Sequence, residues 1–232
     1  MANIIVDVDT QRDFMLPDGS LFVPAEPAVR MAIARVLQQA QREGTPILGS
    51  VDSHAHDAWE FQANGGPFAP HCVKGSPGWL RVFHDIPRRT RFVPMQAVDA
   101  TVAPAIVRNL VGEAHRGAGN RELGAAALAA EALDGVGVYF EKEVYSLFSN
   151  PAAAPVVDAL AAAMGGPEAV TFDVIGYCTG GYCVDAAAKG LHERGYRVRV
   201  LAFATAPLGG AAGAQRSANE LTQAGIEWVA AP

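Results

Sequence analysis

Short apolar runs of strand length recur along the chain, separated by segments in which apolar residues return every three or four positions. The runs are rich in valine and isoleucine and alternate little, which is typical of strands buried on both faces of a mainly parallel sheet. We therefore predict strands at residues 4–8, 46–51, 136–140, 170–175, 198–203 and 226–229.

The segments between these runs predict helices at residues 26–42, 152–164, 181–194 and 215–223. In the first of them, Val29, Ile33 and Leu37 fall at helical spacing, and Gly44 with Pro46 marks its end. The alternation of strand and helix predicts an α/β fold, a doubly wound and mainly parallel sheet with helices on both faces. In such a sheet, ligands bind at the carboxyl ends of the strands.

Two segments depart from this alternation. Residues 53–91 are polar and rich in glycine and proline, yet they contain Trp59 and Trp79. A loop of that length inside a compact domain is usually functional. Residues 92–134 are rich in alanine, with helical patterning at 101–111 and 121–133, and we interpret them as a helical insertion that serves as a lid or a subunit contact. The whole chain, 1–232, is expected to form one domain with this insertion.

Composition excludes several classes of function. The 232 residues carry 18 basic and 24 acidic side chains, so the net charge of -6 provides no electrostatic footprint for nucleic acid. No apolar run reaches the roughly 18 residues that a membrane span requires, and no secretory signal is expected at the N-terminus. Three cysteines do not make a disulfide framework. We therefore expect a cytoplasmic globular protein.

Acidic side chains gather where the first predicted strand ends. Asp7, Asp9 and Asp13 lie within seven residues, at the sheet edge where an α/β active site forms. Strand alternation would place Asp7 and Asp9 on the same face, with Asp9 nearer the carboxyl end. The alternative is a polar loop in which these carboxylates cap a turn or pair with Arg12.

The second predicted strand is followed by a group of metal-binding residue types. Asp52 and His54 follow it directly, and His71 lies further along the loop. Two histidines and one carboxylate suit zinc, iron or manganese and leave coordination positions open. Solvated loop histidines are the alternative, and the sequence leaves the role of His56 open.

Two cysteines flank the segment between the fourth predicted strand and the next helix. Cys178 lies in a Gly-x-Cys-x-Gly pattern like a nucleophile elbow, but the only downstream histidine, His192, lies about four helical turns away, so no triad forms. A thiolate at Cys183 would be favoured by the helix N-terminus. Lys142, at the carboxyl end of the third predicted strand, is the fourth candidate.

Residues 65–78 read Gly-Gly-Pro-Phe-Ala-Pro-His-Cys-Val-Lys-Gly-Ser-Pro-Gly, which resembles the GGxWPxHCVxxTPG segment of nicotinamidases. With the motifs at 6–14, 51–64, 138–142 and 174–232, the chain resembles the cysteine hydrolases of the isochorismatase-like superfamily, and nicotinamidases most closely. The resemblance implies Asp9 as general base, Lys142 as its partner and Cys183 as the nucleophile that forms a thioester. It also implies an oxyanion hole from the N–H groups of Thr179 and Cys183, beside a cis peptide.

The same resemblance implies a metal site and a substrate pocket. Asp52, His54 and His71 would hold a divalent ion, most commonly zinc, with iron or manganese as alternatives. Phe14, Phe68 and Tyr145 would contact the flat ring of the substrate.

The implied function is hydrolysis of a small carboxamide, nicotinamide first, by a homodimer or homotetramer. The alternatives are a related C–N hydrolase acting on a different small amide, or a catalytically silent binding subunit. The chain departs from the family at Tyr177, where glycine is usual, and at Gly180, where many members have threonine. These departures concern the shape of the oxyanion turn.

Overall fold

Parallel strands form a single sheet in the computed structural model, which describes residues 1–95 and 124–232. The seven strands of this sheet lie in the order β3-β4-β2-β1-β5-β6-β7, and each neighbouring pair is parallel. Their bounds are β1 Ala2–Val8, β2 Ile47–Asp52, β3 Arg89–Val93, β4 Val136–Lys142, β5 Val170–Thr179, β6 Arg197–Pro207 and β7 Glu227–Val229. All of the predicted strands are present, and the predicted α/β fold class is confirmed.

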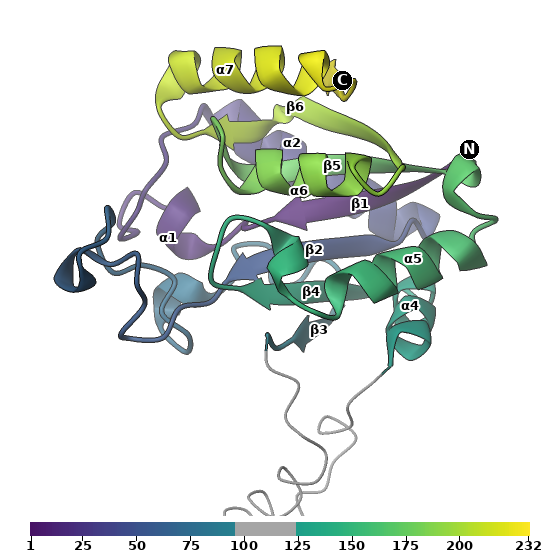
Figure 1. Ribbon diagram of the computed structural model, residues 1–232, viewed down its shortest axis with the longest axis horizontal. Coiled ribbons are helices and arrows are strands. Elements are labelled where there is room, and N and C mark those ends of the chain that lie inside the picture. The colour runs from purple at the N-terminus through teal and green to yellow at the C-terminus, as the bar shows by residue number, and fades with distance from the viewer. Residues whose placement is uncertain (96–123) are drawn as a thin grey trace, which may run out of the picture.

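Helices lie on both faces of the sheet. In Figure 1, α5 and α6 lie in front of the strands, α2 lies behind them, and α7 lies beside β6, near the edge that β7 forms. The bounds are α1 Arg12–Met15, α2 Pro27–Glu43, α4 Ala125–Leu133, α5 Ala153–Ala163, α6 Cys183–His192 and α7 Gly210–Gln223, with short 3₁₀ turns at Gln62–Asn64, Pro77–Trp79, Leu147–Ser149 and Pro167–Ala169. Helix α7 begins five residues before its predicted start, because its first turns consist of glycine and alanine and lack an apolar period.

An edge strand that the sequence did not predict lies where the predicted loop at 53–91 meets the predicted insertion at 92–134. Strand β3 pairs with β4 from Arg89 opposite Val136 to Val93 opposite Phe140. Only Val93 of this strand is fully buried, so it lacks the apolar run that marks the other strands. Helix α4 confirms the helix predicted at 121–133, whereas the helix predicted at 101–111 lies outside the described residues.

The main apolar core lies between the sheet and helices α5 and α6. Val6, Leu48 and Phe140, from three neighbouring strands, face Val157 of α5 and Leu191 of α6. All five side chains are buried. Apolar burial on this face supplies the main free energy that holds helices to sheet.

A buried ion pair holds the other face of the sheet to the loop before β3. Arg81 Nη2 donates to Asp7 Oδ2 at 2.9 Å, Tyr139 Oη donates to the same oxygen at 2.8 Å, and the Arg81 guanidinium stacks 3.8 Å above the Tyr139 ring. The backbone of this loop also pairs with the residues after β1, since the Val82 N–H donates to Thr10 O at 2.8 Å. The loop is therefore fixed to the chain that follows β1.

Removing one partner of this ion pair should destabilise the fold. The Asp7 side chain is fully buried and that of Arg81 is nearly so, so Arg81→Met would leave a carboxylate without its counter-charge. We expect the free energy of unfolding to fall by about 3–5 kcal/mol in a urea titration. The double variant Asp7→Leu/Arg81→Met should recover part of this loss, and an unchanged midpoint in Arg81→Met would contradict the role of the pair.

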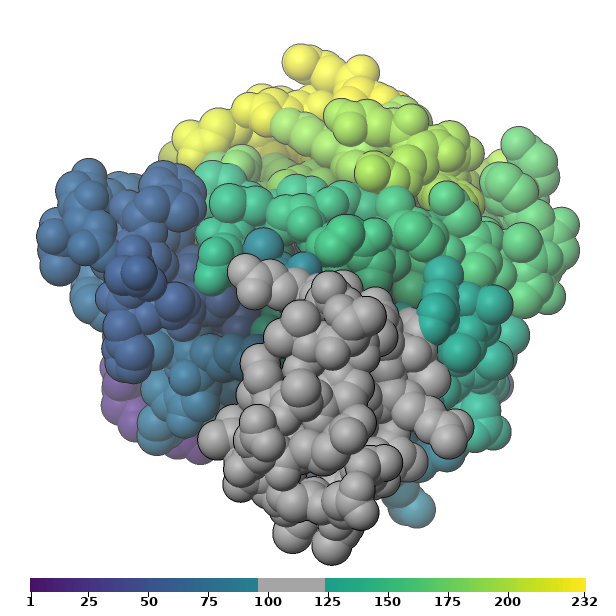
Figure 2. Space-filling model, turned by 60° about the horizontal axis from the view of Figure 1, so that its bottom comes forward, coloured from purple at the N-terminus to yellow at the C-terminus, as the bar shows by residue number. Residues whose placement is uncertain are grey.

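The polar loops gather at one end of the molecule. The segment between β2 and β3, blue in Figures 1 and 2, lies at the end toward which β1 and β2 point. This is the carboxyl edge of the parallel sheet, the position expected for a functional site. None of the helices in the described residues has the length and hydropathy needed to cross a bilayer.

Candidate active site and metal centre

Four elements bring the predicted catalytic residues together. Asp9 follows β1, Asp52 ends β2, Lys142 ends β4, and Cys183 is the first residue of α6. Asp52 and Lys142 are register partners on adjacent strands. Strands β4, β2, β1 and β5 are neighbours in this order, and α6 follows β5. Because these strands are parallel, the residues at their carboxyl ends meet at one edge of the sheet.

Lys142 connects the four residues. Its Nζ lies 2.9 Å from Asp9 Oδ2, 2.9 Å from Asp52 Oδ1 and 3.5 Å from Cys183 Sγ. The Lys142 side chain is completely buried. Burial alone would lower the pKa of Lys142, but the charges of Asp52 and Asp9 raise it well above its usual value. Lys142 is therefore a permanent cation at the centre of the site.

Asp9 has the position and the environment of a proton acceptor. Its φ of 50° breaks the strand alternation just beyond β1. As a result Asp9 and Asp7 lie in different networks and do not form the cluster that alternation predicted. Asp9 Oδ1 accepts from Ser50 Oγ at 2.7 Å. Burial raises the pKa of Asp9, although Lys142 opposes this rise, so the carboxylate is more basic than an exposed one.

Cys183 occupies the first position of α6, as expected for a thiol at a helix N-terminus. Burial opposes the thiolate that this position was expected to favour, since it raises the pKa of Cys183 well above its usual value, although Lys142 opposes this rise. The resting thiol is therefore neutral, and a base must remove its proton. Cys178 lies buried within β5, which extends through Gly176–Thr179, a stretch that the sequence had placed in the turn.

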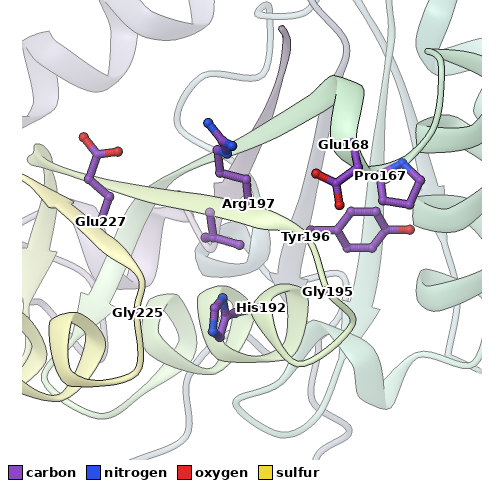
Figure 3. A pocket seen from close by; sticks show the side chains of 9 residues that line it. Pro167, Glu168, His192, Gly195, Tyr196, Arg197, Gly225 and Glu227 are labelled. Carbon is purple, nitrogen blue, oxygen red and sulfur yellow. The ribbon is translucent and has the colours of Figure 1, made fainter.

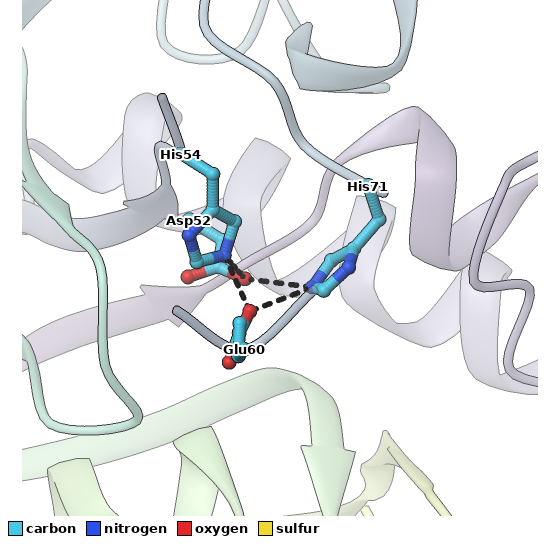
Figure 4. Close-up of side chains that lie close together, drawn as sticks. All are labelled: Asp52, His54, Glu60 and His71. Carbon is cyan, nitrogen blue, oxygen red and sulfur yellow. Dashed lines mark hydrogen bonds and ion pairs between the residues drawn. The ribbon is translucent and has the colours of Figure 1, made fainter. Parts of the chain in front are cut away.

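Four side chains form a second cluster beside Lys142 (Figure 4). They are Asp52, His54, Glu60 and His71, which are all buried and whose ligand atoms lie within 4.8 Å of one another. Glu60 Oε1 is 2.7 Å from His54 Nε2 and 3.2 Å from His71 Nε2, and Asp52 Oδ2 is 2.9 and 3.4 Å from the same two atoms. Two imidazole nitrogens and two carboxylate oxygens at these separations fit a divalent metal ion.

The orientation of His71 supports this fit. Its Nδ1 lies 2.8 Å from Ala69 O, so Nδ1 donates to this carbonyl and Nε2 is the ring nitrogen that faces the cluster. Burial alone would lower the pKa values of both histidines, but hydrogen bonds to Asp52 and Glu60 raise that of His54 to about 9 and that of His71 to about 10. These ion pairs are the contacts that a bound cation would replace.

The sequence predicted three of these four residues and missed Glu60. Glu60 lies six residues after His54 in an irregular loop, where no spacing rule for metal ligands applies. The available signal was its position between Trp59 and Phe61, an acid flanked by aromatic residues. His56 is exposed and does not belong to the cluster.

Asp52 belongs to both clusters. Its Oδ1 contacts Lys142 and its Oδ2 contacts the two histidines. Burial alone would raise its pKa, but the Lys142 charge lowers it well below the usual value, so the carboxylate stays ionised. Gln11, which the sequence did not single out, fixes the Asp52 backbone: it accepts from the Asp52 N–H at 2.7 Å and donates to Asp52 O at 2.8 Å.

Solved structures match this chain over nearly its whole length. No protein-family model and no curated protein matches it. The pyrazinamidase of Pyrococcus horikoshii in complex with zinc covers 99% of this chain and 99% of its own, at 22% identity and a TM-score of 0.67. The nicotinamidase of Bacillus subtilis covers 99% of both chains at 18% identity and a TM-score of 0.63. The N-carbamoylsarcosine amidase of Thermoplasma acidophilum covers 98% of this chain and 95% of its own, at 21% identity and a TM-score of 0.57.

The chain has the isochorismatase-like fold. The resemblance inferred from the sequence is thus confirmed for the fold. Within the isochorismatase-like fold, the residues predicted for the oxyanion hole, Thr179 and Cys183, lie on either side of the turn formed by residues 180–182. The expected cis peptide bond is absent from this turn. Among the described residues, the cis peptide bond is the one between Ile86 and Pro87.

The three aromatic residues predicted to contact substrate fall into two groups. Phe14 and Phe68 have their ring centroids 5.6 and 5.7 Å from that of His71, so both adjoin the metal-ligand cluster. Tyr145 stacks edge-to-face on Tyr182, next to Cys183, with centroids 5.3 Å apart. Two of them therefore lie beside the metal-ligand cluster and the third lies beside the residue that precedes Cys183.

A surface pocket of about 440 Å³ lies elsewhere (Figure 3). It includes His192 at the end of α6 and Arg197 at the start of β6, so it opens at the amino edge of the sheet. No predicted catalytic or metal-binding residue lines it. The chemistry described above therefore belongs to the opposite edge.

Proposed function

We propose that this protein is a metal-dependent cysteine amidohydrolase that releases ammonia from a small carboxamide. The observation that carries this proposal is the position of Lys142, whose Nζ contacts Asp9, Asp52 and Cys183 at 2.9, 2.9 and 3.5 Å. A base, a buried cation and a thiol in contact are the groups that nucleophilic acyl transfer needs.

The residues divide the reaction between them as follows. Asp9 removes the proton from the Cys183 thiol, and Sγ attacks the amide carbonyl. The Cys183 N–H stabilises the oxyanion, because the Thr179 N–H, the other predicted donor, takes part in the pairing of β5 with β6. Asp9 then gives the proton to the departing nitrogen, so ammonia leaves and a thioester remains. Asp9 next takes a proton from water, whose oxygen attacks the thioester carbon; the C–S bond breaks, the carboxylic acid leaves, and Asp9 returns the proton to Cys183 Sγ.

We further propose that Asp52, His54, Glu60 and His71 hold a divalent ion. Such an ion supplies an electrophilic site that orients a ring nitrogen or carbonyl of the substrate. Four protein ligands close a tetrahedral ion, so an open position requires a higher coordination number, which iron and manganese adopt readily. These four ligands are therefore as well suited to iron or manganese as to zinc.

Nicotinamide is the first substrate to test, since nicotinamidases and a pyrazinamidase share the fold. Ammonia release from nicotinamide, pyrazinamide and N-carbamoyl amino acids should be measured with zinc-, iron- and manganese-loaded protein. We expect turnover of at least one of these amides. Absence of turnover throughout would favour the silent binding subunit.

A homodimeric or homotetrameric state and a cytoplasmic location stay predictions.

Glu60 should contribute directly to metal affinity. Glu60→Gln removes the charge that contacts both histidines, and we expect metal binding to weaken by about 10-fold or more in a competition titration with a chelator. His56→Gln, a change to an exposed histidine of the same loop, is the matched control and should leave affinity unchanged. Equal affinities of both variants and the unmodified protein would exclude Glu60 as a ligand.

A further inference from the structure

The turn between β5 and α6 is held by a hydrogen-bonded chain that begins on α7. The Gly180 N–H donates to Ser217 Oγ at 2.6 Å, and Ser217 Oγ donates to Asp185 Oδ1 at 2.6 Å. Ser217 is fully buried and Asp185 is 1% exposed. Because the Ser217 proton points to Asp185, a lone pair of its oxygen faces Gly180. The carboxylate thus fixes the direction of the hydroxyl.

Two further contacts fix the backbone on both sides of Gly180. Leu208 N–H donates to Thr179 O at 3.0 Å, so both ends of the Thr179–Gly180 peptide group have partners. Arg216 donates to Gly180 O from Nε at 3.1 Å and from Nη2 at 3.0 Å, which fixes the following peptide group. The rotation of both peptide groups is therefore determined by α7 and by the segment that precedes it.

The packing here leaves no room for side chains. A Cβ on Gly180, whose φ is 99°, would lie 2.5 Å from Leu208 O, and a Cβ on Gly213 would lie 2.2 Å from the same atom. The close approach of α7 is what brings the Ser217 hydroxyl within reach of the turn. It also explains why this chain has glycine at position 180, where the resembling sequences often have threonine.

We propose that Ser217, oriented by Asp185, is a positioning residue that holds the turn leading to the Cys183 N–H, the oxyanion donor of this site. This inference rests on the proposed function. The Cys183 N–H lies directly after this turn, whereas the Gly180 N–H is bonded to Ser217 and the Thr179 N–H takes part in the pairing of β5 with β6. Oxyanion donors act only in a fixed geometry, so a loosened turn lowers the rate of the chemical step.

The test compares Ser217→Ala with Thr222→Ala, which removes a hydroxyl from the same helix where it bonds only within α7. Ser217→Ala should lower kcat for the best amide about 10- to 100-fold, with KM and metal content unchanged. Thr222→Ala should retain wild-type kcat. Asp185→Asn, whose amide oxygen still accepts from Ser217, should retain most activity, whereas Asp185→Ala should lose part of it.

Hydrogen exchange of the Gly180 amide provides a readout that does not depend on catalysis. We expect this amide to lose protection in Ser217→Ala and to keep it in Thr222→Ala. Unchanged kcat and unchanged protection in Ser217→Ala would overturn the inference, as would lost protection with unchanged kcat. If the unmodified protein hydrolyses no amide, the proposed function fails, and retained Gly180 protection in Ser217→Ala would separately show that Ser217 does not hold the turn. If Ser217→Ala does not fold, Asp185→Ala provides the test, and a kcat equal to that of wild type in this variant would overturn the inference.

Discussion

Replacing Cys183 with alanine is expected to lower kcat for amide hydrolysis by about 10⁴-fold or more. Cys183 Sγ, the nucleophile of the proposed mechanism, lies 3.5 Å from Lys142 at the N-terminus of α6. In that mechanism no neighbouring group replaces it, because Asp9 and Lys142 form an ion pair to which we assign proton transfer and charge compensation. The measurement is ammonia release by metal-loaded wild-type and variant protein, with metal content determined in both.

Cys178→Ala is the matched control for this experiment. Cys178 is also buried and lies close by in the chain, and burial raises the pKa of both thiols well above the usual value, but Cys178 belongs to β5 and not to the N-terminus of α6. The control should retain most of the activity. Turnover that survives in Cys183→Ala and disappears in Cys178→Ala would transfer the nucleophile to Cys178 and contradict the mechanism.

Replacing Lys142 with methionine is expected to impair both folding and catalysis. The substitution leaves Asp9 and Asp52 buried beside each other without their shared cation. Removal of one partner from a buried ion pair costs about 3–5 kcal/mol, and two carboxylates are affected here. We expect a lower unfolding midpoint in urea and a fall in kcat of about 10³-fold, because Asp9 would then take up a proton and cease to act as a base.

Lys74→Met provides the comparison for Lys142→Met. Lys74 also pairs with a carboxylate, Glu141, at 2.6 Å, but its side chain is 53% exposed. Glu141 is buried, but the Lys74 ammonium reaches solvent, so Lys74→Met should lower the unfolding midpoint much less than Lys142→Met does. Equal midpoints for the two variants would show that the buried charges of the site do not depend on Lys142.

Much of the fold and of the site could be predicted from the sequence, because both depend on local patterns. Apolar runs such as 170–175 mark strands buried on both faces, and parallel strands present their following residues at one edge. This reasoning located Asp9, Asp52 and Lys142 from three different strands. The loop motif around His71 added the third metal ligand.

The features that the sequence did not predict depend on tertiary contacts. Strand β3 has a polar sequence and is defined by its pairing with β4. Glu60 joins His54 and His71 through the path of an irregular loop. The raised pKa of the Cys183 thiol follows from burial, which outweighs the charge of Lys142 and which local sequence does not reveal.

The most direct test of the central claim is detection of an acyl group on Cys183. Metal-loaded protein should be mixed with the amide it hydrolyses fastest, quenched in acid within the first turnover, digested and analysed by mass spectrometry. A substrate-derived acyl thioester on the peptide containing Cys183, which disappears as the acid product forms, is the predicted result. Amide hydrolysis at full rate with Cys183 unmodified at every quench time, under conditions that preserve a thioester standard, would contradict the account.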